Sequence, residues 1–340
     1  MNRDEFRTAV FARDGGRCVF CGAPAQDAHH VLERRLWPDG GYHPDNGIAV
    51  CTACHLDCER TLRSVEEGRA DAGITAVLLP DHFERDATYD KWGNVILSDG
   101  RRSPGELFHD PSVQKALAAV GVLDRFTPYV KYPRTWHLPW SHPNHRNHPT
   151  GSSDRFLAGV DHFAGVEVVI TEKMDGENTT IYRDHIHARA IDGTSHKSQG
   201  WVRQFAATIG HELPDGFRVC GENLYARHSI RYADLPSYFL GFAVWERDRC
   251  LGWDDTLEWF ALLGVTPVRE LFRGPFDVVD WRALAAETER RGREGYVVRR
   301  ADAFRFPEFK RAVAKHVRPN HLQTPARWSS RFEKNLLADT

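Results

Sequence analysis

Two pairs of cysteines near the N-terminus constrain the fold of this chain more than any other feature. Cys18 and Cys21 form the stretch CVFC, and Cys51 and Cys54 form CTAC, with 29 residues between the pairs. Each C-x-x-C can place two thiolates on one turn, and two such turns supply the four tetrahedral ligands that zinc prefers. The spacing therefore predicts one structural Zn²⁺ ion bound by these four thiolates. We expect the remaining cysteines to take no part in it: Cys58, Cys220 and Cys250.

Length and composition set broad limits on the kind of protein. The chain has 340 residues, which is enough for two domains that each bury a core. Its 45 Lys and Arg nearly balance 47 Asp and Glu, so the overall charge indicates no class of partner. No run of 18 apolar residues occurs, and the N-terminus lacks the apolar core of a signal peptide. We therefore expect a cytoplasmic protein without a membrane partner, in which cysteines bind metal rather than form disulfides.

Basic residues gather in two stretches. Residues 299–340 contain ten Lys or Arg and four Asp or Glu. Residues 128–151 contain three basic residues, four His, no acid, and Trp136 and Trp140. Basic and aromatic side chains mixed in this way suit phosphate chains and bases, which favours a nucleic-acid partner. The alternative is a solvated face followed by a Pro-rich connector.

Histidines and an asparagine lie between and after the cysteine pairs, in the stretches DAHHVLERR and HPDNGIAVC and at His55. This pattern resembles the HNH endonuclease family in its zinc-stapled ββα form, over about residues 5–62. The resemblance implies that His29 and His55 hold a catalytic divalent metal. It also implies that His30 deprotonates the attacking water and that Asn46 orients the His30 imidazole. An imidazole is a usable base at neutral pH, and a metal beside it offsets charge on the phosphate. The alternative is a zinc scaffold that binds nucleic acid without cutting it.

Residues 63–124 carry no recognisable chemistry, and we expect them to form a connector or subdomain. The stretch DPSVQKALAAVGV predicts a helix within it. Asp110 suits the N-cap, Pro111 suits the first turn, and Gly121 suits the end of that helix.

A lysine stands between a predicted strand and a tight turn in the stretch VEVVITEKMDGEN. Lys173 follows the alternating apolar run and precedes an Asp-Gly turn. Five short apolar stretches with polar residues at matching places come later in the chain: HIHARAIDG, RVCGENLYA, YFLGFAVWE, REGYVVRR and AVAKHVRPNH. Such a set predicts strands that converge on a common cleft.

The five stretches and their order resemble the covalent nucleotidyltransferases, which include polynucleotide ligases and capping enzymes. With KYPRTWHLPW at residues 131–140, they look most like the RNA ligase branch, and the resemblance covers about residues 125–325. It implies that Lys173 attacks the α-phosphorus of ATP and forms a lysyl-AMP intermediate. A lysine with a pKa of about 10.4 is neutral only roughly once in two to three thousand at pH 7. A Mg²⁺ or Mn²⁺ ion and a second cation are expected to lower that pKa.

The resemblance also assigns roles to residues along these strands. Lys315 matches a lysine that contacts the α-phosphate, and Glu294 matches a residue that engages the catalytic metal. For the nucleotide, Glu222 matches the acceptor of a ribose hydroxyl, Phe242 the ring stacked on adenine, and Arg189 a ribose-phosphate contact. Three residues beside the lysine complete the expected nucleotide-binding set: Glu172, Asp175 and Asn178.

Two positions depart from the RNA ligase pattern. Ala243 stands where an acidic residue is common after the stacking Phe, and Val313 stands where a second lysine is common. The second departure leaves Lys315 as the matching cation. Two stretches outside the motifs, DDTLEWFALLGV and DVVDWRALAAETERRG, predict amphipathic helices capped by Asp.

Taken together, the sequence predicts an α+β protein. A small zinc-stapled ββα (HNH) module over residues 1–62 is followed by the connector over 63–124. An RNA ligase domain of antiparallel sheets with flanking helices covers 125–340. The expected function is ATP-dependent joining of 5′-phosphate and 3′-hydroxyl ends of RNA, in nicked or broken duplexes, for repair or processing. The module at the N-terminus adds an expected metal-dependent nuclease activity, and whether a protein partner exists stays open.

Three alternatives stay open at the level of the sequence. The first is a DNA nick ligase on the same scaffold, with DNA ends as the substrate. The second is a guanylyltransferase, which differs in the nucleotide that it uses. The third is a non-catalytic protein that binds nucleic-acid ends and uses the HNH-like module as a zinc scaffold.

Overall fold

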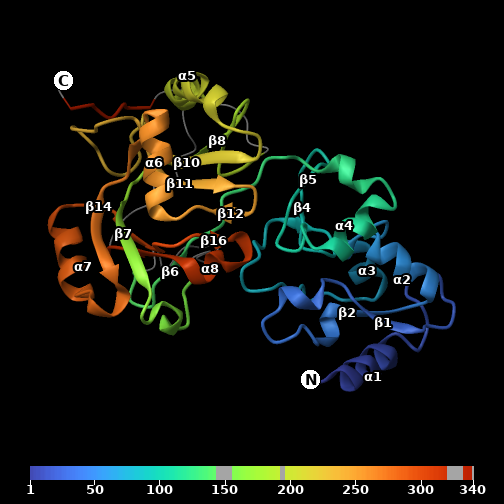
Figure 1. The fold of residues 1–340 in the computed structure, drawn as a ribbon. Coiled ribbons are helices and arrows are strands. Elements are labelled where there is room, and N and C mark those ends of the chain that lie inside the picture. Colours follow the sequence, from blue (N-terminus) through green and yellow to red (C-terminus); the bar gives the residue numbers. More distant parts are fainter. Residues whose placement is uncertain (143–154, 192–195, 320–331, 339–340) are drawn as a thin grey trace. The chain divides into compact units, whose positions relative to one another are not determined.

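The computed structural model describes residues 1–142, 155–191, 196–319 and 332–338. The chain divides into two compact units, residues 1–130 and 131–340, and both combine helices with sheets (Figure 1). Residues 63–124, predicted as a connector, lie in the first unit together with the cysteine pairs. Among the helices of the described ranges, none has the length and apolar character that a membrane crossing requires.

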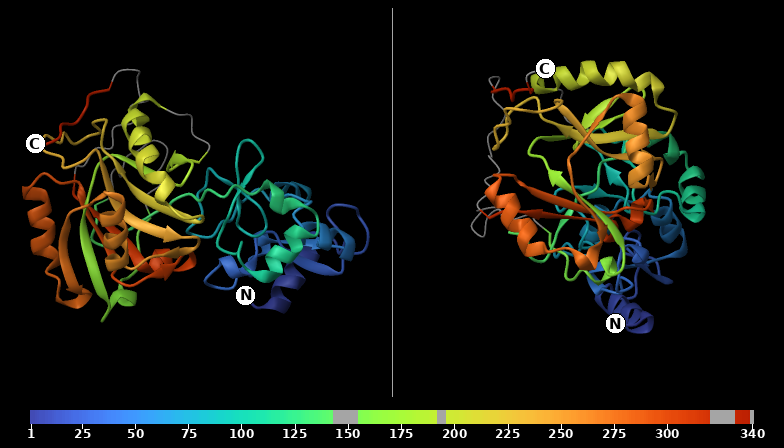
Figure 2. Two further views of the ribbon diagram at one scale, coloured as in Figure 1. Left: turned by 45° about the horizontal axis from the view of Figure 1, so that its top comes forward. Right: turned by 60° about the vertical axis from the view of Figure 1, so that its left-hand side comes forward.

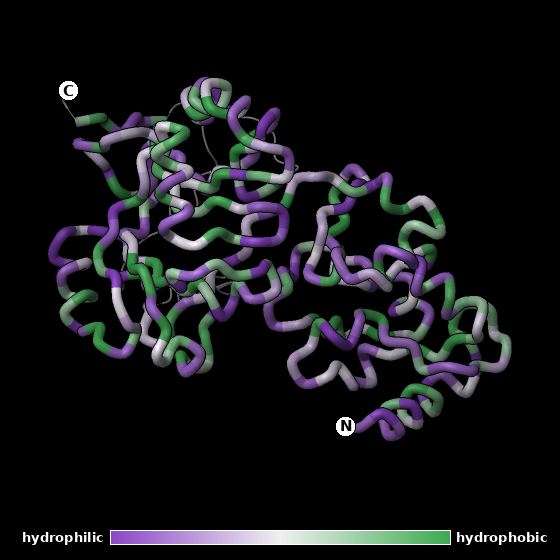
Figure 3. Tube along the Cα trace, in the orientation of Figure 1, coloured by the Kyte–Doolittle hydropathy of each residue, from purple (hydrophilic) through white to green (hydrophobic). Residues whose placement is uncertain are grey.

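The first unit begins with a helix that packs on a pair of short strands. Helix α1 (Arg3–Arg13) starts at Asn2, whose side chain forms a capping box with Glu5. Strands β1 (Asp27–His30) and β2 (Gly47–Val50) pair antiparallel, and α2 (Thr52–Glu59) follows directly, so the order is strand, strand, helix. Hydrophilic and hydrophobic residues alternate along α1 (Figure 3), and its buried Phe6 and Val10 pack against Ala49 of β2.

The rest of this unit adds two helices and a small sheet. The sheet is antiparallel, in the order β3, β4, β5. These elements are α3 (Val65–Asp71), β3 (Thr88–Tyr89), β4 (Val95–Ile96), β5 (Arg102–Ser103) and α4 (Pro111–Ala118). Asp110 caps α4 by accepting a hydrogen bond from the Ser112 N–H at 2.8 Å. The helix ends at Ala118, before Gly121, because Gly121 adopts a left-handed φ of 68° and starts a separate 3₁₀ turn.

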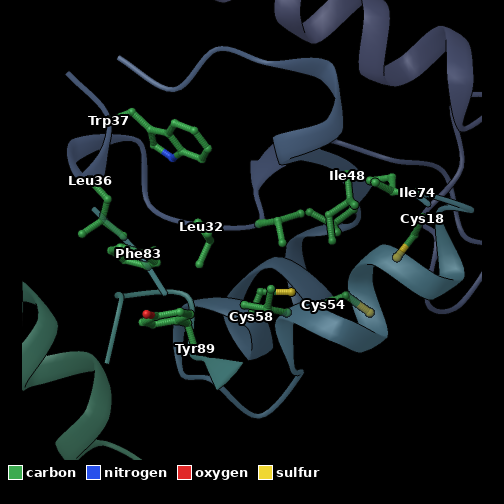
Figure 4. Close-up of a cluster of buried hydrophobic side chains, with 13 residues drawn as sticks. Cys18, Leu32, Leu36, Trp37, Ile48, Cys54, Cys58, Ile74, Phe83 and Tyr89 are labelled. Atoms are coloured by element: carbon green, nitrogen blue, oxygen red, sulfur yellow. The ribbon is translucent and has the colours of Figure 1, made fainter. Parts of the chain in front are cut away.

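One hydrophobic core joins both halves of the first unit (Figure 4). Leu32, Ile48 and Cys58 come from the strand–strand–helix part, while Phe83 and Tyr89 come from the segment after it. The rings of Phe83 and Tyr89 stack with centroids 4.1 Å apart. Residues 1–62 and 63–124 therefore bury apolar surface against each other.

The described residues of the second unit form two sheets, and Lys173 lies where the chain passes from one to the other. The five-stranded sheet has the order β14-β7-β15-β17-β6, with strands β6 (Trp136–His137), β7 (Glu167–Lys173), β14 (Glu270–Pro275), β15 (Gly295–Arg300) and β17 (Val313–Val317). The seven-stranded sheet has the order β16-β12-β11-β10-β8-β9, with β13 beside β11. Its strands are β8 (Glu177–Ile181), β9 (Ile186–Ala188), β10 (Phe217–Asn223), β11 (Phe239–Glu246), β12 (Arg249–Cys250), β13 (Thr266–Pro267) and β16 (Phe304–Arg305).

Helices flank both sheets (Figure 2). Val202 of α5 and Phe260 of α6 share a core with Val244 of the seven-stranded sheet. On the five-stranded sheet, Trp281 of α7 packs beside Phe276 with ring centroids 4.7 Å apart. The α-helices in the described part of this unit are α5 (Gly200–Ile209), α6 (Trp253–Leu263), α7 (Trp281–Arg290) and α8 (Phe309–Ala312).

The start of α6 differs from the prediction, whereas the start of α7 agrees with it. Gly252, rather than an aspartate, is the N-cap of α6, and Asp254 lies in the first turn. There its carboxylate pairs with Arg273 instead of the helix backbone. Asp280 caps α7 as predicted, accepting a hydrogen bond from the Ala283 N–H at 2.9 Å.

Candidate functional site

The four predicted zinc thiolates converge in the first unit. The Sγ atoms of Cys18, Cys21, Cys51 and Cys54 all lie within 4.8 Å of one another. Gly22 allows the first turn with a left-handed φ of 73°, and its N–H donates to the Cys18 carbonyl at 2.8 Å. Burial opposes ionisation of the Cys18 thiol, yet backbone hydrogen bonds from Cys51, Cys21 and Phe20 lower its pKa to about 7. Four thiolates at this spacing form a donor set that fits tetrahedral Zn²⁺.

Cys58 stands apart from this group, in agreement with the prediction. It lies in the hydrophobic core beside Tyr89 (Figure 4). Burial raises the pKa of its thiol to about 12, so it stays protonated. Its sulfur is not part of the group of four described above, so Cys58 serves as a packing group.

A second group of potential metal ligands contains both predicted histidines and one residue that the sequence analysis missed. One nitrogen each from His29 and His55 and one oxygen from Glu59 lie within 4.8 Å of one another. Glu59 Oε1 is 3.5 Å from His29 Nδ1 and 3.4 Å from His55 Nε2. His55 and Glu59 are four residues apart on α2, so they share one helix face. From that i, i+4 spacing, the sequence could have predicted Glu59 as a third ligand.

Lys91 is a further missed residue at this place, and it comes from the predicted connector. Its Nζ lies 3.1 Å from Glu59 Oε1 and 3.0 Å from Glu33 Oε2. Burial lowers the pKa of His29 well below its ordinary value, and the positive charge of Lys91 adds to that effect. His29 is therefore a neutral imidazole, which is the form that binds a metal ion.

His30 faces the same pocket as His29, although successive residues of a strand point to opposite faces in a regular sheet. Its ring stacks on Phe6 with centroids 4.5 Å apart and an interplanar angle of 12°. Burial lowers the pKa of His30 to about 4, with a further contribution from Lys91. Within the described residues its Nε2 atom is buried without a hydrogen-bond partner. This nitrogen therefore has an unused hydrogen-bonding position.

Asn46 is not placed to orient the His30 ring, and this corrects the sequence prediction. Its Nδ2 donates to the carbonyl of Leu32 at 3.0 Å, and its Oδ1 accepts from the Leu32 N–H at 2.9 Å. Nδ2 also donates to the Gly41 carbonyl at 3.2 Å. Because the buried amide forms all of these hydrogen bonds with backbone groups, Asn46 stabilises the segment between β1 and β2 instead.

In the second unit, a cavity collects most of the residues predicted to bind the nucleotide. Residues from both sheets line it, including Thr171 and Val297 of the five-stranded sheet. Seven predicted site residues are among them: Glu172, Lys173, Asn178, Arg189, Glu222, Phe242 and Lys315. Lys315 on β17 lies opposite Val297 of β15, which in turn lies opposite Thr171 of β7. The two predicted lysines therefore reach the cavity from strands separated by β15.

Lys173 forms an ion pair with Glu294, the residue that directly precedes β15. The Lys173 Nζ donates to Glu294 Oε2 at 2.7 Å, and the glutamate side chain is only 2% exposed. Burial alone lowers the pKa of Lys173, but the carboxylates of Glu294 and Glu222 outweigh it and raise the pKa above its usual value. The amine is thus held in its protonated form by its own surroundings.

Glu222 lies on β10, opposite Asn178 of β8. Its Oε1 accepts a hydrogen bond from the Gly176 N–H at 3.2 Å, in the turn that follows the lysine. Burial raises the pKa of Glu222 to about 8, against the opposing effect of the Lys173 charge. Asn178 lines the cavity, and within the described part of the chain its buried Oδ1 has no hydrogen-bond partner.

Around Phe242 the cavity contains two residues to which the sequence analysis gave no role, Tyr132 and Arg299. Phe242 packs edge to face with Tyr132, with centroids 5.1 Å apart. Arg299 is buried beside them, and its guanidinium donates to the carbonyls of Phe242 at 3.1 Å and Leu251 at 2.8 Å. Arg299 stands two residues after Val297 on β15, so both side chains point to the face that lines the cavity. From that alternation along the strand, the sequence could have predicted that Arg299 lines the cavity.

Asp175 occupies a different place from the one expected for a nucleotide contact. It is not among the described residues that line the cavity. Its Oδ2 accepts hydrogen bonds from the Ser229 N–H at 2.8 Å, the Ser229 hydroxyl at 2.6 Å and the Ile230 N–H at 2.7 Å. The carboxylate of Asp175 therefore anchors the connection between β10 and β11 to the turn after the lysine.

Comparison with known proteins decides which family this second site resembles. Residues 166–317 match the RNA ligase family. None of the curated proteins matches the chain. Among solved structures, Naegleria gruberi RNA ligase with PPi is 21% identical, with a TM-score of 0.36, and the match covers 47% of this chain and 51% of that one. The K326A mutant of the same ligase with ATP and Mn is 17% identical, with a TM-score of 0.34 and the same two coverages.

An archaeal ATP-dependent RNA ligase (form 2) is also similar, with 16% identity and a TM-score of 0.40 over 56% of this chain and 48% of that chain. The chain thus spans about half of the length of these solved structures. The RNA ligase match runs from just before β7 to the last residue of β17. It contains Lys173, Glu294 and Lys315, whereas the cysteine and histidine groups of the first unit lie outside it.

Proposed function

We propose that this chain is an ATP-dependent RNA ligase that works through a lysyl-AMP intermediate. The observation that carries the proposal is the convergence of Lys173, Glu222 and Lys315 on one cavity inside the segment that matches the RNA ligase family. A nucleophile, a carboxyl group and a second cation in one cavity are what transfer of a nucleotidyl group to an amine requires.

In the first step, Lys173 Nζ attacks the α-phosphorus of ATP. The N–P bond forms while the bond from that phosphorus to the pyrophosphate oxygen breaks, and pyrophosphate leaves. The amine needs a lone pair, so the proton that Glu294 stabilises must first be lost. Mg²⁺ or Mn²⁺ held at Glu294 would supply positive charge for the phosphates. With its carboxylate turned to such a cation, Glu294 would no longer stabilise the protonated amine, which would lower the pKa of Lys173.

The walls of the cavity suit the other parts of the nucleotide. Phe242 offers a ring face for adenine, and Tyr132 supports that ring from its edge. Glu222 suits a ribose hydroxyl, because a buried carboxyl group gains from a hydrogen-bonding partner. Arg189 and Lys315 add the positive charge that phosphate oxygens need, and Glu172 and Asn178 complete the lining.

In the later steps, AMP passes from Lys173 to a 5′-phosphate end, and a 3′-hydroxyl displaces AMP to seal the strand. We propose RNA ends as the substrate, in nicked or broken duplexes. The basic and aromatic character of residues 128–151 and 299–340 supports a nucleic-acid partner.

The test is incubation with α-labelled ATP and a divalent metal, followed by addition of nicked RNA or nicked DNA duplexes. We expect labelled protein first and sealed RNA second. Lys173→Ala should give no labelled protein, whereas Lys197→Ala, which changes an exposed lysine of the same unit, should label normally. Sealing of DNA alone would favour a DNA nick ligase, and labelling from GTP alone would favour a guanylyltransferase. Absence of label on the wild-type protein would favour a non-catalytic protein that binds nucleic-acid ends.

A second candidate function belongs to the first unit, where we infer a metal-dependent nuclease of the HNH type supported by a structural Zn²⁺. The observation that favours it is the meeting of His29, His55 and Glu59 beside His30 in one pocket. Two imidazoles and one carboxylate can hold a divalent cation. His30 would then act as the base toward a water molecule. Nicking of RNA or DNA in the presence of Mg²⁺, Mn²⁺ or Ni²⁺ tests it, and a scaffold would show none.

A further inference from the structure

We propose that the segment of residues 332–338, near the C-terminus, positions the nucleophile turn, with Asn335 as the positioning residue. This inference rests on the proposed ligase function. The segment lies beyond residue 317, where the match to the RNA ligase family ends. It packs on the connection between β10 and β11, which in turn holds Asp175.

Asn335 is the centre of this contact. It is fully buried, at 0% exposure, between exposed neighbours on both sides. Its Nδ2 donates to the carbonyl of Leu224 at 2.8 Å, and its Oδ1 accepts from the Tyr232 N–H at 3.0 Å. One side-chain amide thus ties the start of this connection to its middle.

Backbone hydrogen bonds extend the contact along the whole segment. The Leu336 N–H donates to the Tyr232 carbonyl at 3.0 Å, and the Leu235 N–H donates to the Leu336 carbonyl at 3.1 Å. The Asn335 N–H donates to the Tyr225 carbonyl at 3.2 Å. The segment therefore completes the backbone pairing of the β10–β11 connection, whose buried polar groups need partners.

The other side of this connection holds the turn that follows Lys173. The Asp175 N–H donates to the Tyr232 hydroxyl at 2.9 Å, while the Asp175 carboxylate accepts from Ser229 and Ile230. Tyr232 is thus bound through its backbone to Asn335 and through its side chain to Asp175. From Asp175 the nucleophile is two residues away.

The same amide also supports the strand that carries Glu222. Leu224, whose carbonyl Asn335 binds, follows Glu222 by two residues, and Glu222 accepts from the Gly176 N–H of the nucleophile turn. Loss of the Asn335 amide would leave the Leu224 carbonyl and the Tyr232 N–H unpaired inside the protein, which is costly enough to shift the connection. A small shift of a nucleophile away from its line of attack lowers the rate steeply.

The test compares Asn335→Ala with Leu336→Ala, which changes an exposed side chain of the same segment and keeps its backbone. Two rates are measured below the melting temperature of every variant. One is formation of lysyl-AMP at saturating ATP, and the other is sealing of RNA that already carries AMP on its 5′-phosphate. The second reaction does not use Lys173 as a nucleophile. We expect Asn335→Ala to slow lysyl-AMP formation roughly tenfold or more, with a clearly smaller effect on sealing, and Leu336→Ala to change neither.

If Asn335→Ala folds poorly, Tyr232→Phe tests the same proposal. It keeps the packing of the ring and removes the hydroxyl that accepts the Asp175 N–H, so the same selective loss is expected. Equal losses in both reactions would mean that Asn335 only stabilises the fold, and would overturn the proposal, as would an unchanged rate of lysyl-AMP formation. Failure of the ligase proposal itself looks different, because the wild-type protein would then form no lysyl-AMP.

Discussion

Lys173 Nζ lies 2.7 Å from Glu294 Oε2, and the glutamate is almost closed to solvent. This ion pair opposes the proposed chemistry, since a protonated amine cannot attack phosphorus. If Glu294 binds the metal as proposed, the same carboxylate would hold the amine in its protonated form in the absence of metal. The reactivity of the lysine would then depend on metal binding.

Glu294→Gln should therefore have two opposite effects. The pKa of Lys173 should fall, because the charge that raises it is gone, and the lysine should react faster with an amine-directed reagent in the absence of metal. Formation of lysyl-AMP should fall by roughly 10²-fold or more, because the metal contact is gone as well. Peptide mapping of the labelled lysine and gel assays of AMP transfer measure the two effects. An unchanged reagent reactivity would show that Glu294 does not control the amine.

Substitutions in the cavity proposed to bind ATP should distinguish residues that bind the nucleotide from residues that speed the chemical step. Phe242→Ala and Glu222→Ala should mainly raise the KM for ATP, because their expected contacts are made equally before and during the reaction. Lys315→Ala should mainly lower kcat, because charge on the transferring phosphorus develops in the transition state. Steady-state adenylylation over a range of ATP concentrations distinguishes the two. Small and equal effects from all three substitutions would refute the assigned roles.

One zinc ion per chain is expected in the purified protein. Cys51→Ser should release it and unfold the first unit, since structural zinc sites commonly supply the folding free energy. Cys58→Ala is the matched control, because this thiol lies in the core outside the four-sulfur group. Metal analysis and thermal melting measure both outcomes. Folded wild-type protein without zinc would contradict the assignment.

Local patterns in the sequence predicted those parts of the sites that come from short, regular motifs. The four cysteines meet in one group, as their spacing suggested. The two histidines that the HNH resemblance singled out meet in a second group, and the lysine that the ligase resemblance singled out lines the cavity of the second unit. Helix caps such as Asp110 and Asp280 were also visible, because capping depends on neighbours within three residues.

Two of the residues that were missed lie far in sequence from the motifs that they join. Lys91 reaches Glu59 from a turn in the predicted connector, and Asn335 reaches Leu224 across more than one hundred residues. No local pattern distinguishes either residue from a surface lysine or asparagine. Asn46 and Asp175 were visible in the sequence, but their hydrogen-bond partners are set by loop geometry that spacing alone does not encode.

Acid should destabilise the second unit through buried His316. Burial lowers its pKa from 6.5 to about 4, with His142 and His137 adding to the effect, and its ring stacks on Tyr296. As the pH falls, His316 takes up a proton in the unfolded chain near pH 6.5 but in the folded chain only near pH 4. Its contribution to the free energy of unfolding is therefore fully present above pH 6.5 and is lost as the pH falls toward 4. The shift corresponds to about 3 kcal/mol. His316→Phe keeps the stacking on Tyr296, and its melting temperature should depend less on pH between 6.5 and 4. Identical profiles for both proteins would refute the prediction.

Cleavage by the first unit should depend on His30 and Glu59 in different ways. His30 lies in the pocket of the metal-ligand group, and its buried Nε2 has no hydrogen-bond partner among the described residues. His30→Ala should lower metal-dependent nicking by roughly 10² or more, the usual contribution of a positioned base, at every metal concentration. Glu59→Gln should instead weaken metal binding, so higher metal concentration should restore part of the activity.

Three controls make the cleavage test decisive. His109→Ala changes an exposed histidine of the same unit and should leave nicking unchanged. Asn46→Ala should lower the melting temperature, because it leaves buried backbone groups of Leu32 and Gly41 unpaired, yet the folded fraction should still cut. Zinc content and lysyl-AMP formation should be the same in His30→Ala as in wild type, since neither uses that imidazole. Wild-type protein that nicks neither RNA nor DNA with Mg²⁺, Mn²⁺ or Ni²⁺ would leave the first unit as a zinc scaffold.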